Sequence, residues 1–414
     1  MQPLAFNEQR LQRQINALAA FSESPAPVVT RVLFSEADLR GRRYVKELCS
    51  ELGLTLREDA VGNVFARWEG TEKDLPAIAT GSHTDAIPNA GRFDGVVGVL
   101  GALEALRGLQ AANFQPRRAI ELIIFTAEEP TRFGLGCLGS RLLGGALLPE
   151  KAAALKDRDG KSLEEWRQHA GYGGRDLSTV KLAQNSYAGF VELHIEQGPL
   201  LEKANCPIGI VEKIAAPSSL RIQLTGVGGH AGAVLMPERH DALLAGAEIA
   251  LAVEHAATNS GSPDTVGTTG VFRIEPGAVN SVPCRAWLEV DLRDTQVTTR
   301  DAALEKIERA GPEICRRRGI EFQMERVNLD APAVCDAKLV ETVADVCREL
   351  NLAAMKMISR AYHDSLFMAQ VCPTVMIFIP CRGGVSHRPD EYSSPEQIKN
   401  GVAVLAHTLA KMAA

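Results

Sequence analysis

The chain has 414 residues, of which 45% are hydrophobic, and its formal net charge at pH 7 is −6. A chain of this length and composition predicts two domains with a sizeable core. The negative net charge predicts no basic surface for a nucleic acid. The sequence has no run of about 18 apolar residues, so we expect no membrane span.

The first part of the chain alternates patterns typical of strands and helices. The opening segment MQPLAFNEQRLQRQIN predicts an amphipathic helix and lacks the apolar core of a secretory signal. Buried strands are predicted at PAIATGSH, AIELIIFTAEE and FVELHIE, with helical stretches between them. This alternation favours a mostly parallel sheet. The nine cysteines lack CxxC spacing, which favours reduced thiols and a cytoplasmic protein.

The pattern changes around Pro207 to Ala216. It continues as the strand LRIQLTGVGGHAG, a helix at 241–255, the strands TVGTTGVFRIEPG and RAWLEVDLRD, a helix at 302–318 and the strand IEFQMERV. This order predicts a split βαβ sandwich of the α+β type. The first pattern then resumes with the strand TVMIFIP between two helices, 338–350 and 395–412. We therefore predict an α/β protein with a discontinuous main domain, residues 1–212 and 329–414, and an inserted domain, residues 213–328.

Six side chains with metal-binding or acid–base chemistry lie where apolar runs end at turns that contain glycine or proline, the usual place for chemistry in an α/β protein. They are His83, Asp94, Glu128, Glu129, His194 and His387. Two metal ions roughly 4 Å apart need one carboxylate to bridge them. Asp94 is the natural bridge because it opens the helical pattern DGVVGVLGALEALRGL. In one plausible allotment, His83 and His194 bind one ion and Glu129 and His387 bind the other.

The predicted ligands are imidazoles and carboxylates without thiolate, which suits Zn, Mn, Co or Ni. Glu128 lies beside a ligand and is the candidate general base. Asp85 follows His83 by two residues and is expected to hold the second nitrogen of that imidazole. Each feature also has an ordinary interpretation, such as a solvated helix start for the two glutamates. Their coincidence at strand-to-turn junctions favours the metal site.

The inserted domain carries three further polar candidates. His230 lies in GGHAGA, Asn280 in GAVNSVP and Arg293 in EVDLRD. Ordinary roles would be a glycine turn, a turn former and a surface ion pair. The functional interpretation is contact with an anionic substrate, in which Arg293 grips a carboxylate and His230 or Asn280 donates to a developing oxyanion. Hinge closure would then assemble the site.

Long motifs throughout the chain resemble one known family. GSHTDAIPNAGRFDGVVGVLGALEAL, EEPTRFGLGCLGSR, ELHIEQGPLLE, GGHAGAVLMPERHDA, NSVPCRAWLEVDLRD and SHRPDEYSS are similar to the hydantoinase/carbamoylase family of dinuclear metallo-amidohydrolases. The resemblance implies two divalent ions, Zn or Mn with Co or Ni also open, on the five ligands above, and Glu128 as base. It implies substrate contacts at Gln197, His230, Asn280 and Arg293. The inserted domain resembles the family's lid and dimerisation domain, which implies a homodimer.

The segment SRAYHDSLFMA departs from the family's common pattern, because Arg360 and Tyr362 replace two glycines. This variant looks most like the ureidoglycolate amidohydrolases. Two bulky donors favour a short, polar acid, although a repacked loop is the alternative. The expected reaction is hydrolysis of the terminal ureido group of ureidoglycolate or a small N-carbamoyl-L-amino acid, with release of ammonia and carbon dioxide. Allantoate or β-ureidopropionate hydrolysis, a dinuclear aminopeptidase or deacylase, and a non-catalytic binding protein remain open.

Overall fold

The structure, a computed structural model, describes residues 4–414 in two compact units. One unit runs to Glu212 and also includes Val334–Ser359 and His363–Ala414, whereas the other comprises Lys213–Ala333 and Arg360–Tyr362. The sequence prediction placed the return of the chain at residue 329, which is the last residue of the fourth long strand of the inserted unit. It did not include Arg360–Tyr362 in that unit.

The larger unit is built on a nine-stranded sheet. Its path is β15-β8-β17-β7-β4-β6-β3-β2, and β16 pairs with β8. The strands are β2 (Thr55–Glu58), β3 (Val64–Trp68), β4 (Ala77–His83), β6 (Ile120–Phe125), β7 (Tyr187–Ile195), β8 (Ile208–Ile214), β15 (Ala333–Val334), β16 (Ala354–Ser359) and β17 (Thr374–Ile379). A separate pair is formed by β1 (Val29–Arg31) and β5 (Ala86–Ala90).

The centre of this sheet is parallel, as predicted. β4 pairs in parallel with β6 and β7, and β7 pairs in parallel with β17. Every residue of β4, β6 and β17 is buried, because the helices cover both faces of a parallel sheet. The pairs β3–β6, β2–β3 and β8–β17 are antiparallel, so the sheet is mixed and its edges were not predicted.

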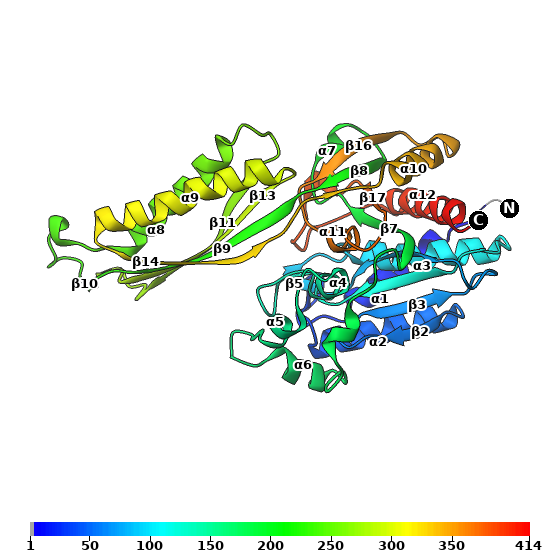
Figure 1. The fold of residues 1–414 in the computed structure, drawn as a ribbon, viewed down its shortest axis with the longest axis horizontal. Helices are drawn as coiled ribbons and strands as arrows, with labels where there is room; N and C mark the ends of the chain where they lie inside the picture. Colours follow the sequence, from blue (N-terminus) through cyan, green and yellow to red (C-terminus); the bar gives the residue numbers. More distant parts are fainter. Residues whose placement is uncertain (1–3) are drawn as a thin grey trace. The chain divides into compact units, whose positions relative to one another are not determined.

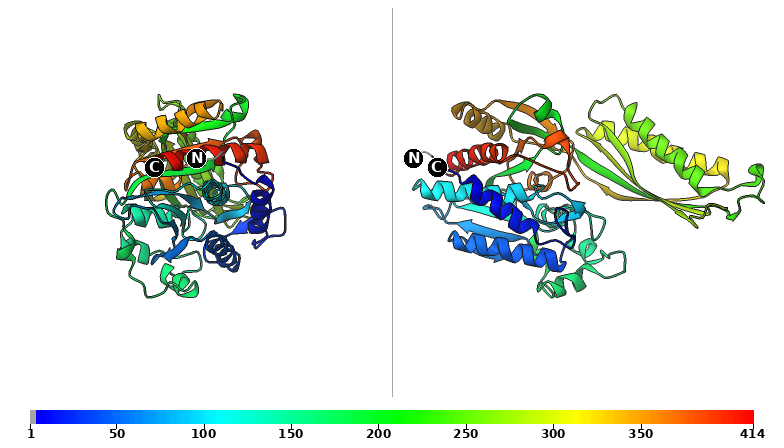
Figure 2. Two further views of the ribbon diagram at one scale, coloured as in Figure 1. Left: turned by 90° about the vertical axis from the view of Figure 1, so that its right-hand side faces the viewer. Right: turned by 180° about the vertical axis from the view of Figure 1, so that it is seen from behind.

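Helices surround the sheet of the larger unit. They are α1 (Glu8–Ala19), α2 (Glu36–Glu51), α3 (Val96–Ala111), α4 (Leu138–Gly144), α5 (Pro149–Ala153), α6 (Leu163–His169), α7 (Leu200–Lys203), α10 (Ala337–Glu349), α11 (Asp364–Met368) and α12 (Pro395–Ala413), with short 3-10 turns at Leu177–Val180 and Arg382–Gly384. The helices α3 and α12 lie side by side against the central strands (Figure 2). Helix α12 begins at a capping box between Ser394 and Gln397.

The inserted unit is a four-stranded antiparallel sheet with the order β11-β13-β9-β14. Its elements are β9 (Ala216–Thr225), β10 (Gly229–His230), α8 (Ala242–Thr258), β11 (Val266–Glu275), β12 (Ser281–Val282), β13 (Arg285–Asp294), α9 (Val297–Arg318) and β14 (Glu321–Leu329), with a 3-10 turn at Met236–Glu238. The helices α8 and α9 pack on this sheet (Figure 1). The predicted strand and helix order of the insert is therefore observed.

Within residues 4–414, no helix combines the length and the apolar character needed to cross a membrane.

Candidate functional site

Asp94 lies at the centre of a compact group of imidazoles and carboxylates in the larger unit. Its Oδ1 lies 3.2 Å from Nε2 of His194 and 3.5 Å from Nε2 of His83. Its Oδ2 lies 3.4 Å from Nε2 of His387, which in turn lies 3.3 Å from Oε1 of Glu129. Each oxygen of Asp94 therefore faces a different group of donors, which is the arrangement a bridging carboxylate requires.

The turn that carries Asp94 depends on glycine. Gly95 has φ of 65° and immediately precedes α3. A Cβ atom at Gly95 would lie 2.4 Å from Nε2 of His83. Because a side chain cannot occupy that space, only glycine allows the His83 ring to approach the turn.

Strand ends supply the other side chains. His83 ends β4, Glu128 and Glu129 follow β6 by a short turn, and His194 lies next to the end of β7. The carboxyl ends of neighbouring parallel strands meet at one edge of a sheet, so residues far apart in sequence converge. The backbone is unusual at three points of this site, since Ala127, Gln197 and His387 have φ values of 53°, 57° and 58°.

Asp85 supports the site in two ways. Its carbonyl oxygen lies 3.1 Å from Nδ1 of His83, and its Oδ1 lies 3.6 Å from the same nitrogen. Its carboxylate also accepts the backbone N–H groups of Glu128 (3.3 Å) and Glu129 (3.1 Å). The contact with the imidazole is thus made mainly by the backbone of Asp85, while the carboxylate holds the turn of the two glutamates.

The imidazoles of this site have raised pKa values. Burial opposes protonation of His83, but Glu128, Asp85 and Asp94 outweigh it and hold the pKa of His83 well above its usual value. For His387, burial is likewise outweighed by Asp94 and Glu129, which raise the pKa to about 9. A divalent cation bound here would displace these protons from the imidazoles. Its positive charge would then balance the negative charge of the carboxylates.

The carboxylates respond to the same surroundings in different directions. Burial favours the neutral form of Asp94, but hydrogen bonds with His194, His387 and His83 bring its pKa well below the ordinary value. Burial raises the pKa of Glu128 well above its usual range. Burial also raises the pKa of Glu129 to about 7.

The donors fit two metal ions. One group of mutually close ligand atoms comprises His83, Asp94 and His194, and a second comprises Asp94, Glu129 and His387. The two groups share Asp94 and match the predicted allotment. A third group, Glu192 with His194 and His363, is also compact. However, the carboxylate of Glu192 already accepts hydrogen bonds from Ser82 and Ser365.

Gln197, predicted as a substrate contact, lies at the centre of the site. Its Nε2 donates to Oδ2 of Asp94 over 2.6 Å, while its Oε1 is buried without a hydrogen-bond partner among the described residues. The side chain therefore has an acceptor left for a further group.

The five remaining predicted residues lie in the inserted unit and form two groups. His230 and Asn280 lie together, because β10 pairs with β12 and the N–H of Ala231 donates to the carbonyl oxygen of Asn280 (2.8 Å). Both side chains are exposed, and Nδ1 of His230 accepts the N–H of Gly232.

The second group surrounds Arg293. Its guanidinium donates to both carboxylate oxygens of Asp291 (2.6 and 3.0 Å) and lies 4.9 Å from the ring centre of Tyr362. Arg360 forms an ion pair with Asp264 of the same unit. Arg360 and Tyr362 are therefore packed into the inserted unit beside Arg293.

The two groups lie at opposite ends of the inserted sheet. Arg285 at one end of β13 pairs with Thr225, and Arg293 near the other end pairs with Pro217. Eight residues of extended strand span about 27 Å. His230 follows the Thr225 end, so a small molecule cannot touch both His230 and Arg293 of the same unit.

Three contacts of this site were missed by the sequence analysis. Ser386 donates to Oδ2 of Asp94 (2.6 Å), Glu391 accepts the N–H of Asp94 (3.1 Å), and Cys137 has its sulfur 3.6 Å from Oε1 of Glu128. Ser386 precedes the predicted ligand His387, and this position was the one feature of the sequence that could have marked it as part of the site. Nothing in the spacing of Glu391 or Cys137 marks them.

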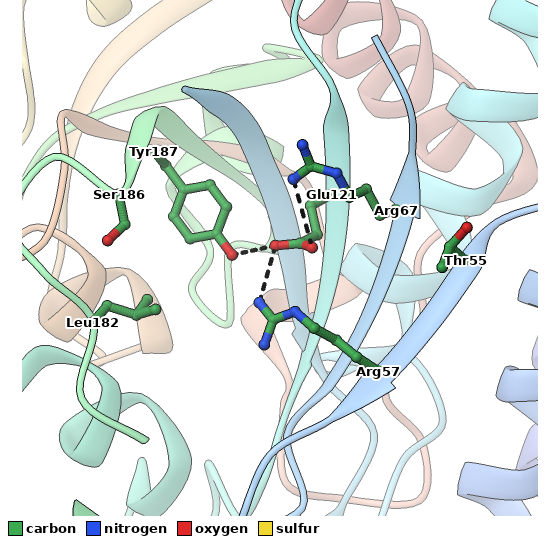
Figure 3. A pocket seen from close by; sticks show the side chains of 7 residues that line it. All are labelled: Thr55, Arg57, Arg67, Glu121, Leu182, Ser186 and Tyr187. Atoms are coloured by element: carbon green, nitrogen blue, oxygen red, sulfur yellow. Dashed lines mark hydrogen bonds and ion pairs between the residues drawn. The ribbon is translucent and has the colours of Figure 1, made fainter. Parts of the chain in front are cut away.

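A cavity of about 350 Å³ lies elsewhere in the larger unit and is separate from this site (Figure 3). A cluster of ion-paired side chains lines it. Arg57, Arg67 and the hydroxyl of Tyr187 all converge on the carboxylate of Glu121. Its charged groups therefore compensate one another. Glu121 is near the start of β6, whereas the candidate site follows the end of that strand.

With this geometry established, the family follows from comparison. The model of peptidase family M20/M25/M40 matches residues 79–411. The chain belongs to this family and, within it, to the hydantoinase/carbamoylase amidases. A solved amidase of that group from Burkholderia multivorans is 32% identical, with a TM-score of 0.83 over 99% of this chain and 98% of the other. The predicted family, α/β fold and enzyme class, an amidohydrolase, are confirmed, and the two clusters that share Asp94 agree with the dinuclear metal site of this family.

The chain is especially similar to one kind of enzyme in this group. It is 53% identical to the ureidoglycolate hydrolase of Arabidopsis thaliana over 97% of this chain and 86% of that protein. The crystal structures of AtUAH in complex with glyoxylate and with (S)-hydroxyglycine are 52% and 51% identical, each with a TM-score of 0.95 over 99% of this chain and 98% of the other.

Proposed function

We propose that this protein hydrolyses the terminal ureido group of ureidoglycolate. The observation that carries the proposal is the combination of the Asp94-centred site with 53% identity to a ureidoglycolate hydrolase over nearly the whole chain. One water cleaves the terminal C–N bond of the ureido group and releases ammonia, and the carbamate that is left breaks down to carbon dioxide and an amine product. For ureidoglycolate the amine is hydroxyglycine, the compound bound in one of the AtUAH structures.

The metal centre is assigned to five residues. His83, Asp94 and His194 would hold one ion, and Asp94, Glu129 and His387 would hold the other. A set of imidazoles and carboxylates suits Zn or Mn, with Co and Ni as further candidates. When bound, the ions supply Lewis-acid polarisation of the carbamoyl group and lower the pKa of water.

Glu128 acts as the general base. Its carboxylate lies 3.8 Å from Nε2 of His83, at the edge of the proposed centre rather than within either ligand group. Bound divalent cations beside Glu128 would keep its carboxylate ionised, so that it can accept a proton. Glu128 takes a proton from the attacking water and returns it to the leaving nitrogen.

Binding of the substrate carboxylate is assigned to the inserted unit and to Gln197. Arg293 is oriented by Asp291 and by the ring of Tyr362, and we assign its guanidinium group to the substrate carboxylate. Asn280 and Gln197 supply amide groups, and His230 donates to the oxyanion of the transition state.

The separation of about 27 Å between the His230 and Arg293 groups favours a homodimer. One small substrate can meet both groups only if they come from different chains. The segment near His230 carries exposed apolar side chains, with Leu235 66% and Met236 67% exposed, as expected for a surface that another chain covers. We therefore place His230 and Asn280 in the site of the partner chain.

A small N-carbamoyl-L-amino acid is the second candidate substrate. Arg360 forms an ion pair with Asp264, and the ring of Tyr362 packs against Arg293. The side chains of Arg360 and Tyr362 therefore leave less room for a substrate beside Arg293. Such packing favours a short acid, and it does not by itself distinguish a hydroxyl from a small amino-acid side chain.

Ammonia release separates the candidates. Purified protein, stripped of metal and supplied with Mn or Zn separately, is assayed with ureidoglycolate, allantoate, N-carbamoyl-β-alanine, small N-carbamoyl-L-amino acids, a dipeptide and an N-acyl amino acid. We expect the highest kcat/KM with ureidoglycolate. A higher value with any other compound overturns the substrate, and turnover of the dipeptide alone would make the protein a peptidase.

A further inference from the structure

Asp94 also contacts two side chains of a segment near the end of the chain, Ser386 and Glu391. The hydroxyl of Ser386 lies 2.6 Å from Oδ2 of Asp94 and 2.9 Å from Oε2 of Glu391. The other oxygen of Glu391 accepts the backbone N–H groups of Phe93 (2.7 Å) and Asp94 (3.1 Å). Glu391 thus contacts both the backbone of the Asp94 turn and, through Ser386, its carboxylate.

The contact is tight and excludes solvent. Glu391 is 4% exposed. A Cβ atom at Gly91 would lie 2.4 Å from Cβ of Glu391, so the turn can approach this closely only because residue 91 is glycine. A buried carboxylate is costly unless its oxygens accept hydrogen bonds. Glu391 meets this condition with the backbone of the very turn that carries Asp94.

The geometry also fixes the rotation of the Asp94 side chain. The hydroxyl of Ser386 lies between the carboxylates of Asp94 and Glu391 and has a single hydrogen. When it donates this hydrogen to one carboxylate, the other carboxylate must accept its hydrogen bonds from other groups. The carboxylate of Glu391 has the two backbone N–H groups, whereas Oδ2 of Asp94 receives Ser386 and Gln197. The hydroxyl of Ser386 lies within hydrogen-bond distance of both carboxylates and can donate its hydrogen either to Oδ2 of Asp94 or to Oε2 of Glu391.

We propose that Glu391 is a positioning residue for the metal centre, which it serves by fixing the Asp94 turn directly and the Asp94 carboxylate through Ser386. This inference rests on the proposed function, in which Asp94 bridges both ions. Since one carboxylate serves both ions, loss of its orientation weakens both binding events together. Outer partners of metal ligands commonly contribute about 10- to 100-fold in metal affinity.

The test is titration calorimetry of the metal-free, full-length protein with Mn²⁺. We expect wild type to bind two ions, and Glu391→Ala to weaken binding of both by about 10- to 100-fold. Glu391→Gln should retain most of the affinity, because its amide oxygen still accepts the N–H groups of Phe93 and Asp94. Asp390→Asn is the matched control, since Asp390 is exposed on the same loop and pairs with Arg388.

Ser386→Ala keeps the test decisive if Glu391→Ala fails to fold. It removes the link to the Asp94 carboxylate and leaves the contacts of Glu391 with the backbone intact, so we expect weaker Mn²⁺ binding with unchanged melting of the metal-free protein. Wild-type affinity in Ser386→Ala and in a folded Glu391→Ala would overturn the inference. Fewer than two Mn²⁺ ions per wild-type chain would instead overturn the proposed metal centre.

Discussion

The sulfur of Cys137 lies 3.6 Å from Oε1 of Glu128, and the N–H of Cys137 donates to the carbonyl oxygen of Glu128 over 2.8 Å. Cys137 is fully buried and has φ of 55°. The same residue therefore holds the backbone of the proposed base and touches its carboxylate. Burial raises the pKa of the Cys137 thiol well above its usual value, so the thiol acts as a neutral donor.

Replacement of Cys137 tests this contact. Cys137→Ala removes the side-chain donor and keeps the backbone hydrogen bond. A weak hydrogen bond contributes about 1 kcal/mol, so we expect kcat to fall roughly fivefold with little change in KM. Cys137→Ser retains a donor and should lie closer to wild type. Equal kcat values for wild type and the alanine variant would show that the thiol does not support the base.

Glu128→Gln is expected to abolish most turnover without loss of metal. The amide is nearly isosteric with the carboxylate but cannot accept the proton, and loss of a general base costs about 10²- to 10⁴-fold in rate. Metal content is measured by elemental analysis of the same preparation, since Glu128 lies outside both ligand groups. Near-wild-type turnover at full metal occupancy would exclude Glu128 as the base.

Residues at strand ends could be predicted from sequence because a short apolar run and its turn are local features. His83, Glu129 and His194 were found in this way, and their convergence followed from the expected parallel sheet. The inserted unit was predicted for a similar reason, since its strands alternate between buried and exposed residues. The parallel centre of the sheet and the helices that cover it followed from the same patterns.

Features that depend on long-range packing escaped prediction. The strand β8 was taken as a change of pattern, because only its first four residues form a buried run. Arg360 belongs to the inserted unit through its ion pair with Asp264, a contact that no local pattern indicates. Glu391 lies in a polar stretch typical of an exposed turn, and its burial depends on backbone groups at Phe93 and Asp94.

The metal-free protein should become less stable as the pH rises from about 6.5 to 9. In the folded chain the pKa of His387 is about 9, above the ordinary value of 6.5. The folded state therefore binds this proton more tightly, and the stabilisation present below pH 6.5 is lost as the pH rises through 9. Glu129 acts with the same sign at lower pH, because its pKa rises from 4.5 to about 7.

Metal ions should reverse this dependence. Imidazole binds a metal in its deprotonated form, so protons and metal compete for His387. The rise in Tm on addition of Mn²⁺ should therefore grow between pH 6.5 and pH 8.5. Differential scanning fluorimetry with EDTA or with Mn²⁺ in matched buffers measures both effects. A metal-induced shift that is constant across this range would contradict the assigned role of His387.

Mixed dimers test whether His230 serves the partner chain. Glu128→Gln lacks the base, and His230→Ala lacks the donor, so each variant alone should be nearly inactive. In a heterodimer, the site with intact Glu128 receives His230 from the other chain and is complete. Random exchange gives half heterodimers with one working site each, so activity should recover to about a quarter of wild type. If His230 acted within its own chain, both sites of the heterodimer would remain defective and mixing would restore nothing.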